Sequence, residues 1–549
     1  MRGTREQRMA DLMRGYPVWE PQTIWSRFTA AVSCHRNREF LRTDSGRTLT
    51  YEQTCERVLR IAAGFSSLGV SAGSFVAVKM SNCLELPLVA LALYRLGAVK
   101  VAVYAGLGAF ETSYVVDTVG APVLVTNEDL AFFGEEAPAS LEHVVTVGDV
   151  SVPEGVSSIA FASLEASAQG LIPEDAASSD DVCDIIFTSG TTGDPKGVPL
   201  THDKLLRSSF ANIMNRGFED GRRVFVPLPL LHCYGLVQGM LGVLFVGGCL
   251  LLNDCGFDVD ASIELMASAA VDDMLCVPIQ AEKIIRRLQE VPRDFSSLHA
   301  VYCSGAPCPT WVLGAIHEQF GVADIINGYG LTETSGATVQ TVPLDSDEVI
   351  DTRVGRILPA GCAGLAEYGG NLCECRVVDP VSGAESAPGE VGELWWRGAC
   401  VADGYFRNPT GSAEAFLDGG WFRSGDLGRI DEAGYVELAG RIKDSYRING
   451  ENVSPRFLER IVERCPLIRM AVIQGIPDAR LGAVGALFAE LFEDTEANRQ
   501  AVRDFCRANL ASHQVPKHYV FLGADEWPRS HTGKIQGFKL QELVTARRT

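Results

Sequence analysis

Residues 184–197 read DIIFTSGTTGDPKG, in which a short apolar run leads directly into a loop rich in Gly and Thr. Gly190, Gly193 and Gly197 allow backbone conformations that other residues avoid, and so expose backbone N–H groups. This composition predicts a phosphate-binding turn in preference to a merely flexible one. It is not a Walker A loop, because the lysine is not part of a Gly-Lys-Ser/Thr triplet. The remaining donors are the hydroxyl groups and ammonium of Thr188, Ser189, Thr191, Thr192 and Lys196.

Short apolar runs alternate with longer amphipathic segments on both sides of this loop. Such alternation is typical of βαβ units with largely parallel sheets, so we predict an α/β fold. The expected strands are residues 75–79, 99–103, 123–126, 184–187, 224–227, 249–252, 273–277, 300–303 and 324–326. The expected helices are residues 84–96, 201–214, 235–245, 261–270, 281–290 and 310–320.

Two further segments follow the βαβ region. Gly, Pro and charged residues become more frequent between residues 354 and 441, which predicts a β-rich subdomain. From residue 452 the pattern predicts a compact α+β unit of helix, two strands, helix, strand and a short tail. We therefore expect a large N-terminal domain over residues 1–440 and a small, mobile C-terminal domain over residues 441–549.

The composition is that of an ordinary globular chain: 549 residues, 46% hydrophobic and 21% charged. Its 16 cysteines show no Cys-x-x-Cys spacing, which favours reduced thiols in the cytoplasm over a disulfide framework or a zinc site. The first residues lack the apolar core of a signal peptide. The most apolar stretch, residues 236–252, contains Gln238 and four glycines, and predicts a buried helix followed by a strand, with no transmembrane segment.

The net charge of −21 argues against a nucleic-acid partner. The charge is unevenly spread. From Arg441 onward there are 17 Lys and Arg against 13 Asp and Glu, a net +4, whereas the first 440 residues have 31 against 56, a net −25. Two interpretations remain: drift in surface composition, or a C-terminal domain that brings cations to an anionic ligand.

The loop FTSGTTGDPKG resembles the signature loop of the adenylate-forming superfamily: acyl- and aryl-CoA synthetases, adenylation domains of peptide synthetases, and beetle luciferases. Further motifs similar to those of the superfamily follow in the same order and span nearly the whole chain. They are NGYGLTET (327–334), GEVGELWWRG (389–398), GYF (404–406), WFRSGDLG (421–428), GRIKDSYRINGENVSP (440–455) and PRSHTGKI (528–535). The chain is most similar to AMP-forming acyl-CoA ligases.

The resemblance implies a nucleotide site built from these motifs. Thr332 would donate its hydroxyl to the α-phosphate, and Glu333 would bind Mg²⁺, which prefers oxygen ligands. Taken alone, Glu333 is equally well explained as a helix cap. Tyr329 would stack on adenine, with Gly305 and Ala306 forming a wall small enough for the ring, and Asp426 would accept hydrogen bonds from the ribose hydroxyls. Together with the signature loop, the expected ATP-binding residues are Gly305, Ala306, Asn327, Gly328, Tyr329, Asp426 and Arg441.

Lys534 is the residue expected to act in catalysis together with Thr332 and Glu333. It lies in a Gly-containing loop near the end of the sequence, and a lysine can bridge the attacking carboxylate and the phosphate. The alternative is a solvated lysine of the tail. His531 stands where many family members have a small residue or Pro, which leaves the conformation of this loop open.

Coenzyme A must reach the same carbonyl in the second step, so the resemblance implies that the small domain rotates about a hinge at Lys443. A surface lysine in a linker is the alternative. After rotation, Gly450 and Glu451 of the GENVSP loop would guide the thiol arm of coenzyme A. Arg447 occupies a position where many relatives have Lys, and its role stays open.

The stretch PLPLLHCYGL (227–236) resembles the segment that lines the acyl pocket, with His232 at the mouth and Tyr234 in the wall. A structural histidine at a strand end is the alternative. No acidic residue in this stretch is available to bind an α-amino group. Neighbouring apolar residues and the glycines of 305, 328, 330 and 336 are expected to leave room for an aromatic or a medium- to long-chain aliphatic acid.

The expected activity is therefore ATP-dependent conversion of a carboxylic acid to its acyl-adenylate, with release of pyrophosphate, and transfer of the acyl group to coenzyme A. Such an AMP-forming carboxylic acid–thiol ligase requires ATP, Mg²⁺ and coenzyme A. Loading of a separate acyl carrier protein is the first alternative. A luciferase-like oxygenase and a non-catalytic nucleotide-binding protein are less well supported, the latter because Lys534, Glu333 and Asp426 occur together.

Overall fold

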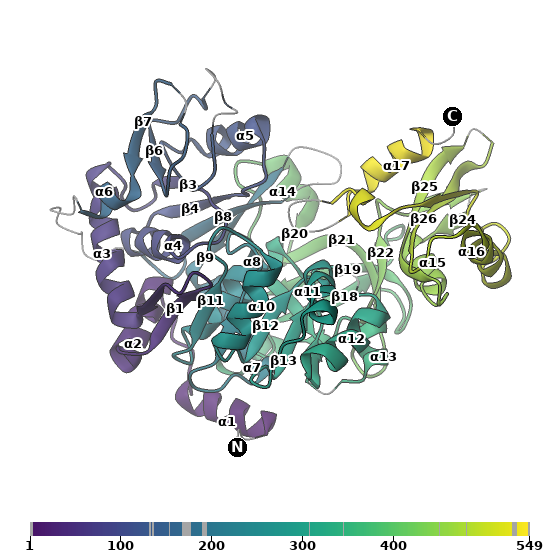
Figure 1. The fold of residues 1–549 in the computed structure, drawn as a ribbon, viewed down its shortest axis with the longest axis horizontal. Coiled ribbons are helices and arrows are strands. Elements are labelled where there is room, and N and C mark those ends of the chain that lie inside the picture. Colours follow the sequence, from purple (N-terminus) through teal and green to yellow (C-terminus); the bar gives the residue numbers. More distant parts are fainter. Residues whose placement is uncertain are drawn as a thin grey trace.

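The computed structural model describes residues 4–130, 133, 137–152, 154–166, 177–188, 195–306, 308–343, 345–448, 451–478, 480–529 and 535–546. It confirms an α/β fold with a large N-terminal and a small C-terminal domain (Figure 1). Over these ranges, the helices are too short or too polar to cross a membrane.

The first seven-stranded sheet contains the strand that leads into the Gly- and Thr-rich loop. Its strands are parallel except for the edge strand β9, which pairs antiparallel with β8. The helix expected over residues 201–214 is confirmed as α7 (His202–Arg216), but the strand β9 before it was not expected. Gly197 and Pro199 disfavour a strand in the sequence, although Pro is tolerated at a sheet edge. In spatial order the strands are β7 (Ser157–Ala160), β6 (His143–Thr146), β5 (Val123–Thr126), β3 (Phe75–Lys79), β4 (Val99–Val103), β8 (Val182–Thr188) and β9 (Lys196–Thr201).

A buried ion pair anchors β8 to its neighbour β4. Lys100 Nζ pairs with Asp184 Oδ1, and both side chains are at most 1% exposed. The hydroxyl of Tyr94 donates to Asp184 Oδ2 at 2.6 Å. Burial raises the pKa of Asp184, and the Lys100 ammonium opposes that shift. Because an unpaired buried charge is costly, this cluster holds the first half of β8 in place against β4.

The second seven-stranded sheet is parallel except for β2, at its edge. The expected strands of both sheets are confirmed, and their ends agree to within two residues. In spatial order this sheet consists of β14 (Asp324–Ile326), β13 (Ala300–Cys303), β12 (Asp273–Cys276), β10 (Arg223–Phe225), β11 (Cys249–Leu252), β1 (Glu39–Thr43) and β2 (Thr48–Thr50).

Helices fill the space between the two sheets and cover their outer faces (Figure 1). Along β3, Val76 and Val78 belong to the core between the sheets, while Ala77 faces the outer core, as the period of two in a strand requires. The inner helices are α2 (Ile24–His35), α3 (Tyr51–Ser67), α4 (Glu85–Leu96) and α7 (His202–Arg216). The outer ones are α5 (Ala109–Val119), α10 (Val259–Ser268), α11 (Pro278–Glu290) and α12 (Thr310–Phe320), and α1 (Arg5–Gly15) and α6 (Phe161–Ala166) lie at the edges.

The helix expected over residues 235–245 is present but irregular. It consists of α8 (Cys233–Gly235), the π-helix η2 (Leu236–Met240) and α9 (Leu241–Val243). A Cβ at Gly239 would lie 2.7 Å from Val226, so glycine is needed for this close packing. π-turns occur often at functional sites, and this one begins at Leu236, the last residue of the segment expected to line the acyl pocket.

A β-rich region follows, as expected. It contains a three-stranded sheet and an antiparallel five-stranded sheet. The first is formed by β15 (Gly328–Leu331), β16 (Gly336–Gln340) and β17 (Arg356–Ile357). The second is formed by β18 (Cys373–Val378), β19 (Gly392–Gly398), β21 (Trp421–Ile430) and β20 (Phe416–Leu417), with β22 (Val436–Arg441) beside β21.

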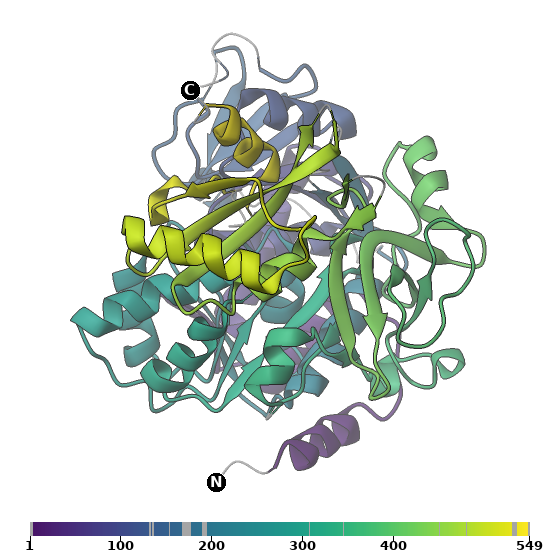
Figure 2. The same ribbon diagram turned by 90° about the vertical axis from the view of Figure 1, so that its right-hand side faces the viewer.

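The C-terminal domain has its own sheet and its own hydrophobic cores. A short tail was expected at its end, but residues Gly537–Ala546 form helix α17, because Leu540 and Val544 pack against Trp527. Figure 2 shows this domain in front of the junction between the parts of the large domain. Its elements are β23 (Tyr446–Ile448), β24 (Glu451–Val453), α15 (Pro455–Val462), β25 (Ile468–Asp478), β26 (Gly482–Leu491), α16 (Glu496–Asn509), β27 (His518–Phe521) and α17.

Contacts with α11 and α12 hold the C-terminal domain in this position. The indole N–H of Trp311 donates to the carbonyl of Arg469 at 3.1 Å, and its ring meets Phe492 edge-on with centroids 6.0 Å apart. Arg286 forms an ion pair with Glu490 at 3.3 Å. Partly exposed polar contacts of this kind are typical of interfaces between domains that move.

Candidate active site

The ends of the Gly- and Thr-rich loop are held at adjacent positions of two strands. Thr188 and Lys196 lie opposite each other in the β8–β9 pair, and the Thr188 hydroxyl donates to the carbonyl of Lys196 at 3.3 Å. The expected phosphate-binding residues Ser189, Gly190, Thr191, Thr192 and Gly193 lie outside the described residues. The strands β8 and β9 therefore form a hairpin, and the first sheet fixes the two residues from which the loop starts and at which it ends.

Lys196, Tyr405 and Glu333 meet beside this hairpin. The ammonium of Lys196 lies 4.7 Å from the centre of the Tyr405 ring, and the Tyr405 hydroxyl donates to Glu333 Oε1 at 2.9 Å. The backbone N–H of Phe406 donates to the carbonyl of Gly197 at 2.8 Å. The GYF motif thus joins the hairpin, whose connecting loop is expected to bind phosphate, to the expected metal ligand.

Glu333 lies with Thr332 on the 3₁₀ turn η3 (Thr332–Thr334), and both residues are at most 9% exposed. Burial raises the pKa of Glu333, while backbone hydrogen bonding, the Tyr405 hydroxyl and the charge of Arg441 lower it. Asp426 also acts on this carboxyl group and raises its pKa. Glu333 is therefore within electrostatic range of the second cluster described below.

That second cluster consists of Tyr329, Asp426 and Arg441. The Tyr329 hydroxyl donates to Asp426 Oδ2 at 2.6 Å, and Arg441 Nε lies 2.8 Å from Asp426 Oδ1. Asp426 and Arg441 are opposite each other in the antiparallel β21–β22 pair. Burial, with the charge of Asp426, raises the pKa of Tyr329 well above its usual range, so Tyr329 stays a hydrogen-bond donor. The structure thus brings together three residues expected to bind ATP.

The segment expected to form the adenine wall connects β13 to α12. Gly305 has φ +83° and is exposed, Ala306 is half-buried, and a Cβ at Gly305 would lie 3.3 Å from Val277. The Ser304 hydroxyl donates to the carbonyl of Gly328 at 2.5 Å, so this wall is tied to the start of β15.

Two expectations about this region need qualification. The Asn327 amide donates to the carbonyls of Ile350 and Arg353, at 3.2 and 3.4 Å, so the side chain holds the end of α13 (Asp347–Thr352). A Cβ at Gly328 would lie 2.4 Å from the Tyr302 hydroxyl, and one at Gly330 only 1.9 Å from a backbone oxygen of β16. The expectation that these two glycines leave pocket space is therefore wrong: they permit close approach of neighbouring groups.

The two expected acyl-pocket residues differ in their surroundings. His232 is half-buried, accepts a hydrogen bond from the Tyr234 N–H through Nδ1 at 3.1 Å, and faces the ring of Tyr104 at 6.2 Å. Tyr234 is 9% exposed, and its hydroxyl donates to the carbonyls of Cys276 and Tyr302, at 3.1 and 2.5 Å. Tyr234 therefore lies against the ends of β12 and β13.

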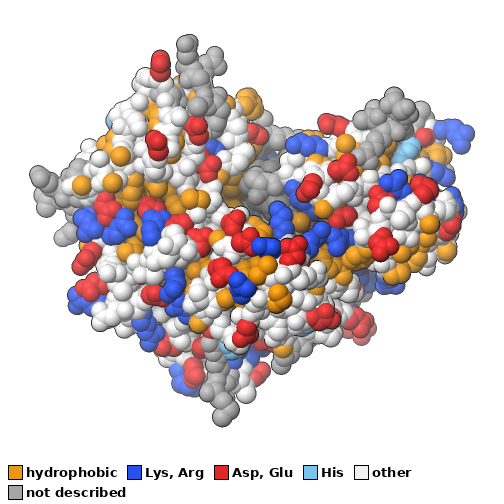
Figure 3. All heavy atoms as spheres, viewed as in Figure 1, with side chains coloured by type: hydrophobic (Ala, Val, Ile, Leu, Met, Phe, Trp, Pro, Cys, Tyr) orange, Lys and Arg blue, Asp and Glu red, His pale blue; other side chains and the backbone are white. Residues whose placement is uncertain are grey.

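On the C-terminal side, Lys443 is exposed and lies in a turn two residues after β22. The backbone N–H of Ile442 donates to the carbonyl of Gly425 at 3.0 Å, so the large domain holds the chain up to the residue before Lys443. Figure 3 shows a hollow between the two domains, with Lys and Arg side chains gathered beside it. Gly450, His531 and Lys534, and the side chains of Arg447 and Glu451, lie outside the described residues.

The structure describes the residues on either side of the loop that contains Lys534. Arg529 and Ile535 pair as a short antiparallel bridge. Burial lowers the pKa of Arg529, while the carboxylates of Glu282 and Glu490 raise it. Glu282 belongs to α11 of the large domain, so the base of the loop faces that domain.

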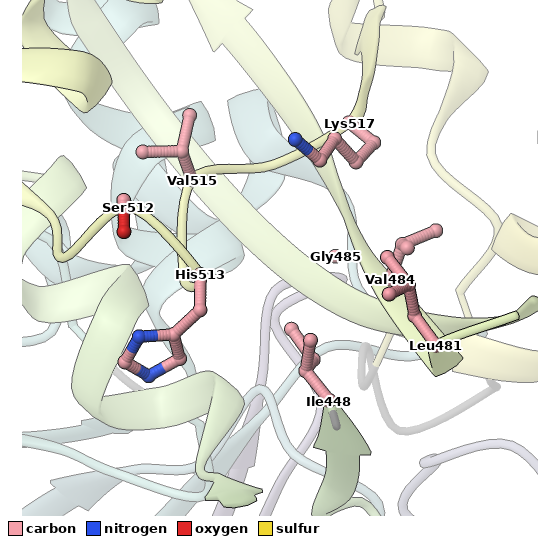
Figure 4. Close-up of a pocket in the computed structure, with 8 residues that line it drawn as sticks. All are labelled: Ile448, Leu481, Val484, Gly485, Ser512, His513, Val515 and Lys517. Carbon is pink, nitrogen blue, oxygen red and sulfur yellow. The ribbon is translucent and has the colours of Figure 1, made fainter.

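A further cavity, of about 190 Å³, lies within the C-terminal domain. Its wall includes Ile448, the last residue of β23 and two residues before the GENVSP stretch, together with the polar side chains of Ser512, His513 and Lys517 (Figure 4). The remaining lining residues are Leu481, Val484, Gly485 and Val515. A lysine beside an apolar wall suits a ligand with an anionic group.

Sequence comparison agrees with this arrangement. Residues 28–406 match the AMP-binding enzyme family, and residues 458–534 match the AMP-binding enzyme C-terminal domain. The chain belongs to the AMP-binding enzyme family. The similarity to the adenylate-forming superfamily, expected from the motifs, is thereby confirmed.

Individual relatives of this AMP-binding enzyme cover almost its whole length. It is 27% identical over 528 residues to the mitochondrial medium-chain acyl-CoA ligase ACSF2 of Homo sapiens, covering 90% of this chain and 83% of that protein. It is 28% identical over 530 residues to the acyl-CoA ligase sidI of Aspergillus fumigatus, covering 91% and 87%. The solved structure of ATP-bound MatB from Rhodopseudomonas palustris matches with a TM-score of 0.81 and 25% identity, covering 96% of this chain and 99% of that one.

Tyr405 was not identified as a site residue from the sequence, although the GYF motif was recognised. Its neighbours reveal its role, because it contacts Lys196 on one side and Glu333 on the other. A tyrosine in a short sequence motif does not by itself indicate such partners. The sequence feature that could have pointed to Tyr405 is the order of the motifs. GYF (404–406) lies between NGYGLTET, which contains the expected metal ligand, and WFRSGDLG, which contains the residue expected to bind the ribose.

We expect Tyr405→Phe to lower the rate of pyrophosphate release by this AMP-binding enzyme about tenfold, because one hydrogen bond to a charged group is lost. The ring, and with it the contact to Lys196, remains. The measurement is acid-dependent pyrophosphate release at saturating ATP. Tyr435→Phe is the matched control, since its hydroxyl donates to Asp345 at 2.8 Å away from the site. An unchanged rate in Tyr405→Phe would show that the hydroxyl does not position Glu333.

Proposed function

We propose that this enzyme activates a carboxylic acid as its acyl-adenylate, with release of pyrophosphate, and then transfers the acyl group to coenzyme A. The observation that carries the proposal is the meeting of two clusters at the phosphate-binding hairpin. Lys196 and Glu333 belong to one, Asp426 and Arg441 to the other, and the charges of Asp426 and Arg441 act on the Glu333 carboxyl group. A site that joins a carboxylate to a triphosphate requires this combination of cations and a carboxylate.

The roles follow from the chemistry of the first step. The carboxylate of the acid attacks the α-phosphorus, and pyrophosphate leaves. The hairpin and Lys196 hold the phosphates, and the Thr332 hydroxyl donates a hydrogen bond to the α-phosphate. Asp426 accepts hydrogen bonds from the ribose hydroxyls, which compete for its carboxylate with Tyr329 and Arg441. Lys534 bridges the attacking carboxylate and the phosphate, which lowers the repulsion between two anions.

Glu333 fits a role as ligand of Mg²⁺. Its carboxylate is a hard oxygen donor held in place by Tyr405. In the described part of the chain, no group of three or more His, Cys, Asp or Glu side chains forms a complete metal site. Mg²⁺ is commonly bound by one or two carboxylates together with substrate phosphates and water, so a single glutamate is sufficient here. When bound, the ion supplies charge neutralisation at the phosphates.

The second step requires the C-terminal domain to move. We place the hinge at Lys443, because the β21–β22 pair and the Ile442 N–H hold the chain just before it. Arg441 and Ile442 then stay with the large domain, two residues beyond the expected boundary at 440/441. Rotation would turn Gly450 and Glu451 toward the site. The cavity beside Ile448 supports this arrangement, since Lys517 offers a cation to a phosphate of coenzyme A.

Lys443→Pro is expected to slow thioester formation selectively, because proline fixes φ and also restricts the residue before it. Adenylate formation should remain near its original rate. The two half-reactions are measured separately, as pyrophosphate release and as thioester formation from supplied acyl-adenylate. Lys443→Ala removes the charge without restricting the backbone and is the control. If both variants behave alike, Lys443 is not the hinge.

An aromatic or medium-chain aliphatic acid suits the pocket best. Tyr234 lies against the ends of two strands, which limits the depth of the pocket there. The relative from Homo sapiens is a medium-chain acyl-CoA ligase, which agrees with an acid of this size.

We further propose that the enzyme acts in the cytoplasm, where its sixteen free thiols would remain reduced.

The decisive experiment measures pyrophosphate release with a panel of straight-chain and aromatic acids, with and without coenzyme A, and identifies the product by mass. We expect an acyl-CoA thioester. Adenylate that accumulates and is not discharged by coenzyme A would favour transfer to an acyl carrier protein. Absence of ATP turnover with every acid would overturn the proposal.

A further inference from the structure

Three cysteine thiols meet beneath the adenine wall. Cys276 ends β12 and Cys303 ends β13, and the two residues are opposite each other in the parallel strand pair. Cys308 precedes α12, and its Sγ lies 3.8 Å from Sγ of Cys303. All three are at most 8% exposed and belong to the same apolar core. None of them takes part in the proposed chemistry.

The surroundings favour reaction at Cys303. Thiol hydrogen bonds from Cys276 and then Cys308 lower the pKa of Cys303, against the effect of burial. The thiolate is the form of cysteine that reacts with peroxides. A disulfide sulfur pair is separated by about 2 Å, so Cys303 and Cys308 need to approach by less than about 2 Å to become bonded.

We propose that Cys303 and Cys308 form a reversible disulfide that controls the adenine wall. Hydrogen peroxide oxidises the Cys303 thiolate to a sulfenic acid, and the O–O bond breaks with release of one water. The Cys308 sulfur then attacks the Cys303 sulfur, and the S–OH bond breaks with release of a second water. Two thiols thus lose two electrons and two protons, and one peroxide becomes two waters. A dithiol reverses the reaction by exchange.

The position of the pair explains why oxidation would affect nucleotide binding. Four residues, 304–307, lie between the two cysteines, and they include the wall residues Gly305 and Ala306. The Ser304 hydroxyl donates to the carbonyl of Gly328. Moving Cys308 toward Cys303 shortens this connection. The wall then shifts relative to β15, where Tyr329 is held by Asp426. This consequence rests on the proposed ATP site, whereas formation of the disulfide does not.

The experiment treats the full-length enzyme with hydrogen peroxide, removes the oxidant with catalase, and blocks the remaining thiols. Peptide mass spectrometry then identifies cross-links, and calorimetry measures the affinity for ATP. We expect a Cys303–Cys308 cross-link, an affinity for ATP about tenfold weaker, which corresponds to about 1.4 kcal/mol, and recovery of both with dithiothreitol.

Variants separate this pair from other thiols. Cys308→Ser should abolish both the cross-link and the loss of affinity, and Cys308→Ala serves if the serine variant is unstable. Cys255→Ser is the matched control, because Cys255 is exposed and lies outside the cluster. A cross-link between Cys276 and Cys303, oxidation restricted to exposed cysteines, or an oxidised pair with unchanged ATP affinity would each overturn the proposal. If the reduced enzyme does not bind ATP, the ATP site itself is wrong, and the cross-link still reports on the cysteines.

Discussion

Replacing Lys534 with Ala is expected to reduce adenylate formation about 10²–10³-fold, the effect of removing one donor from a developing negative charge. Thioester formation from supplied acyl-adenylate should be spared, because the proposed rotation takes the Lys534 loop away from the carbonyl before coenzyme A attacks. The base of this loop faces the large domain, where Glu282 of α11 acts on Arg529. The two half-reactions are followed separately, by pyrophosphate release and by thioester mass.

Lys539→Ala is the matched control for this variant. It removes a lysine of the same domain, five residues further along, on α17. We expect both of its half-reactions to be unchanged. Equal loss of both half-reactions in Lys534→Ala would mean that the lysine supports the site in both steps, and the assignment to adenylation alone would then be wrong.

Glu333→Gln is expected to lower pyrophosphate release about 10²-fold, because the amide cannot supply the negative charge that a metal ligand and its phosphates require. The substitution keeps the shape of the side chain and can still accept the hydrogen bond from Tyr405. The rate is measured over a range of Mg²⁺ concentrations. The apparent affinity for Mg²⁺ should weaken together with the rate.

The control for Glu333→Gln is Glu348→Gln, which removes an exposed carboxylate on α13 of the same domain. A lowered rate with unchanged dependence on Mg²⁺ would assign Glu333 to a purely structural role at η3. Because Mg²⁺ would neutralise phosphates that leave as pyrophosphate in the first half-reaction, we expect Glu333→Gln to affect that half-reaction most. Lys534→Ala and Glu333→Gln would then resemble each other in adenylation and differ in their response to Mg²⁺.

The movement of the C-terminal domain links these predictions. In the present arrangement, Trp311 and Arg286 of the large domain hold Arg469 and Glu490. These contacts are partly exposed, and exposed ion pairs contribute little stability. The arrangement is therefore one that the domain can leave at low cost, as a reaction in two steps requires.

The amino-acid sequence alone determined the α/β fold and the order of the functional motifs. Alternation of apolar runs and amphipathic segments predicted nine of the fourteen strands of the two large sheets, because a strand buried on both faces is a short apolar run between turns. The strands β1, β2, β6, β7 and β9 were not predicted. The sequence did not predict β9, because it contains Gly and Pro, or α17, because it lies in a polar tail. Each of these elements gains its stability from packing against another part of the chain.

Only the tertiary structure decided which motif residues meet. Tyr405 joins Lys196 to Glu333, and Asp426 joins Tyr329 to Arg441, although these partners are separated by many residues in the sequence. It also decided that Gly328 and Gly330 allow close packing and do not enlarge the pocket. The physical reason is that periodicity and composition report on local conformation and burial, whereas hydrogen bonds and ion pairs between distant segments depend on the register of strands that only folding brings together.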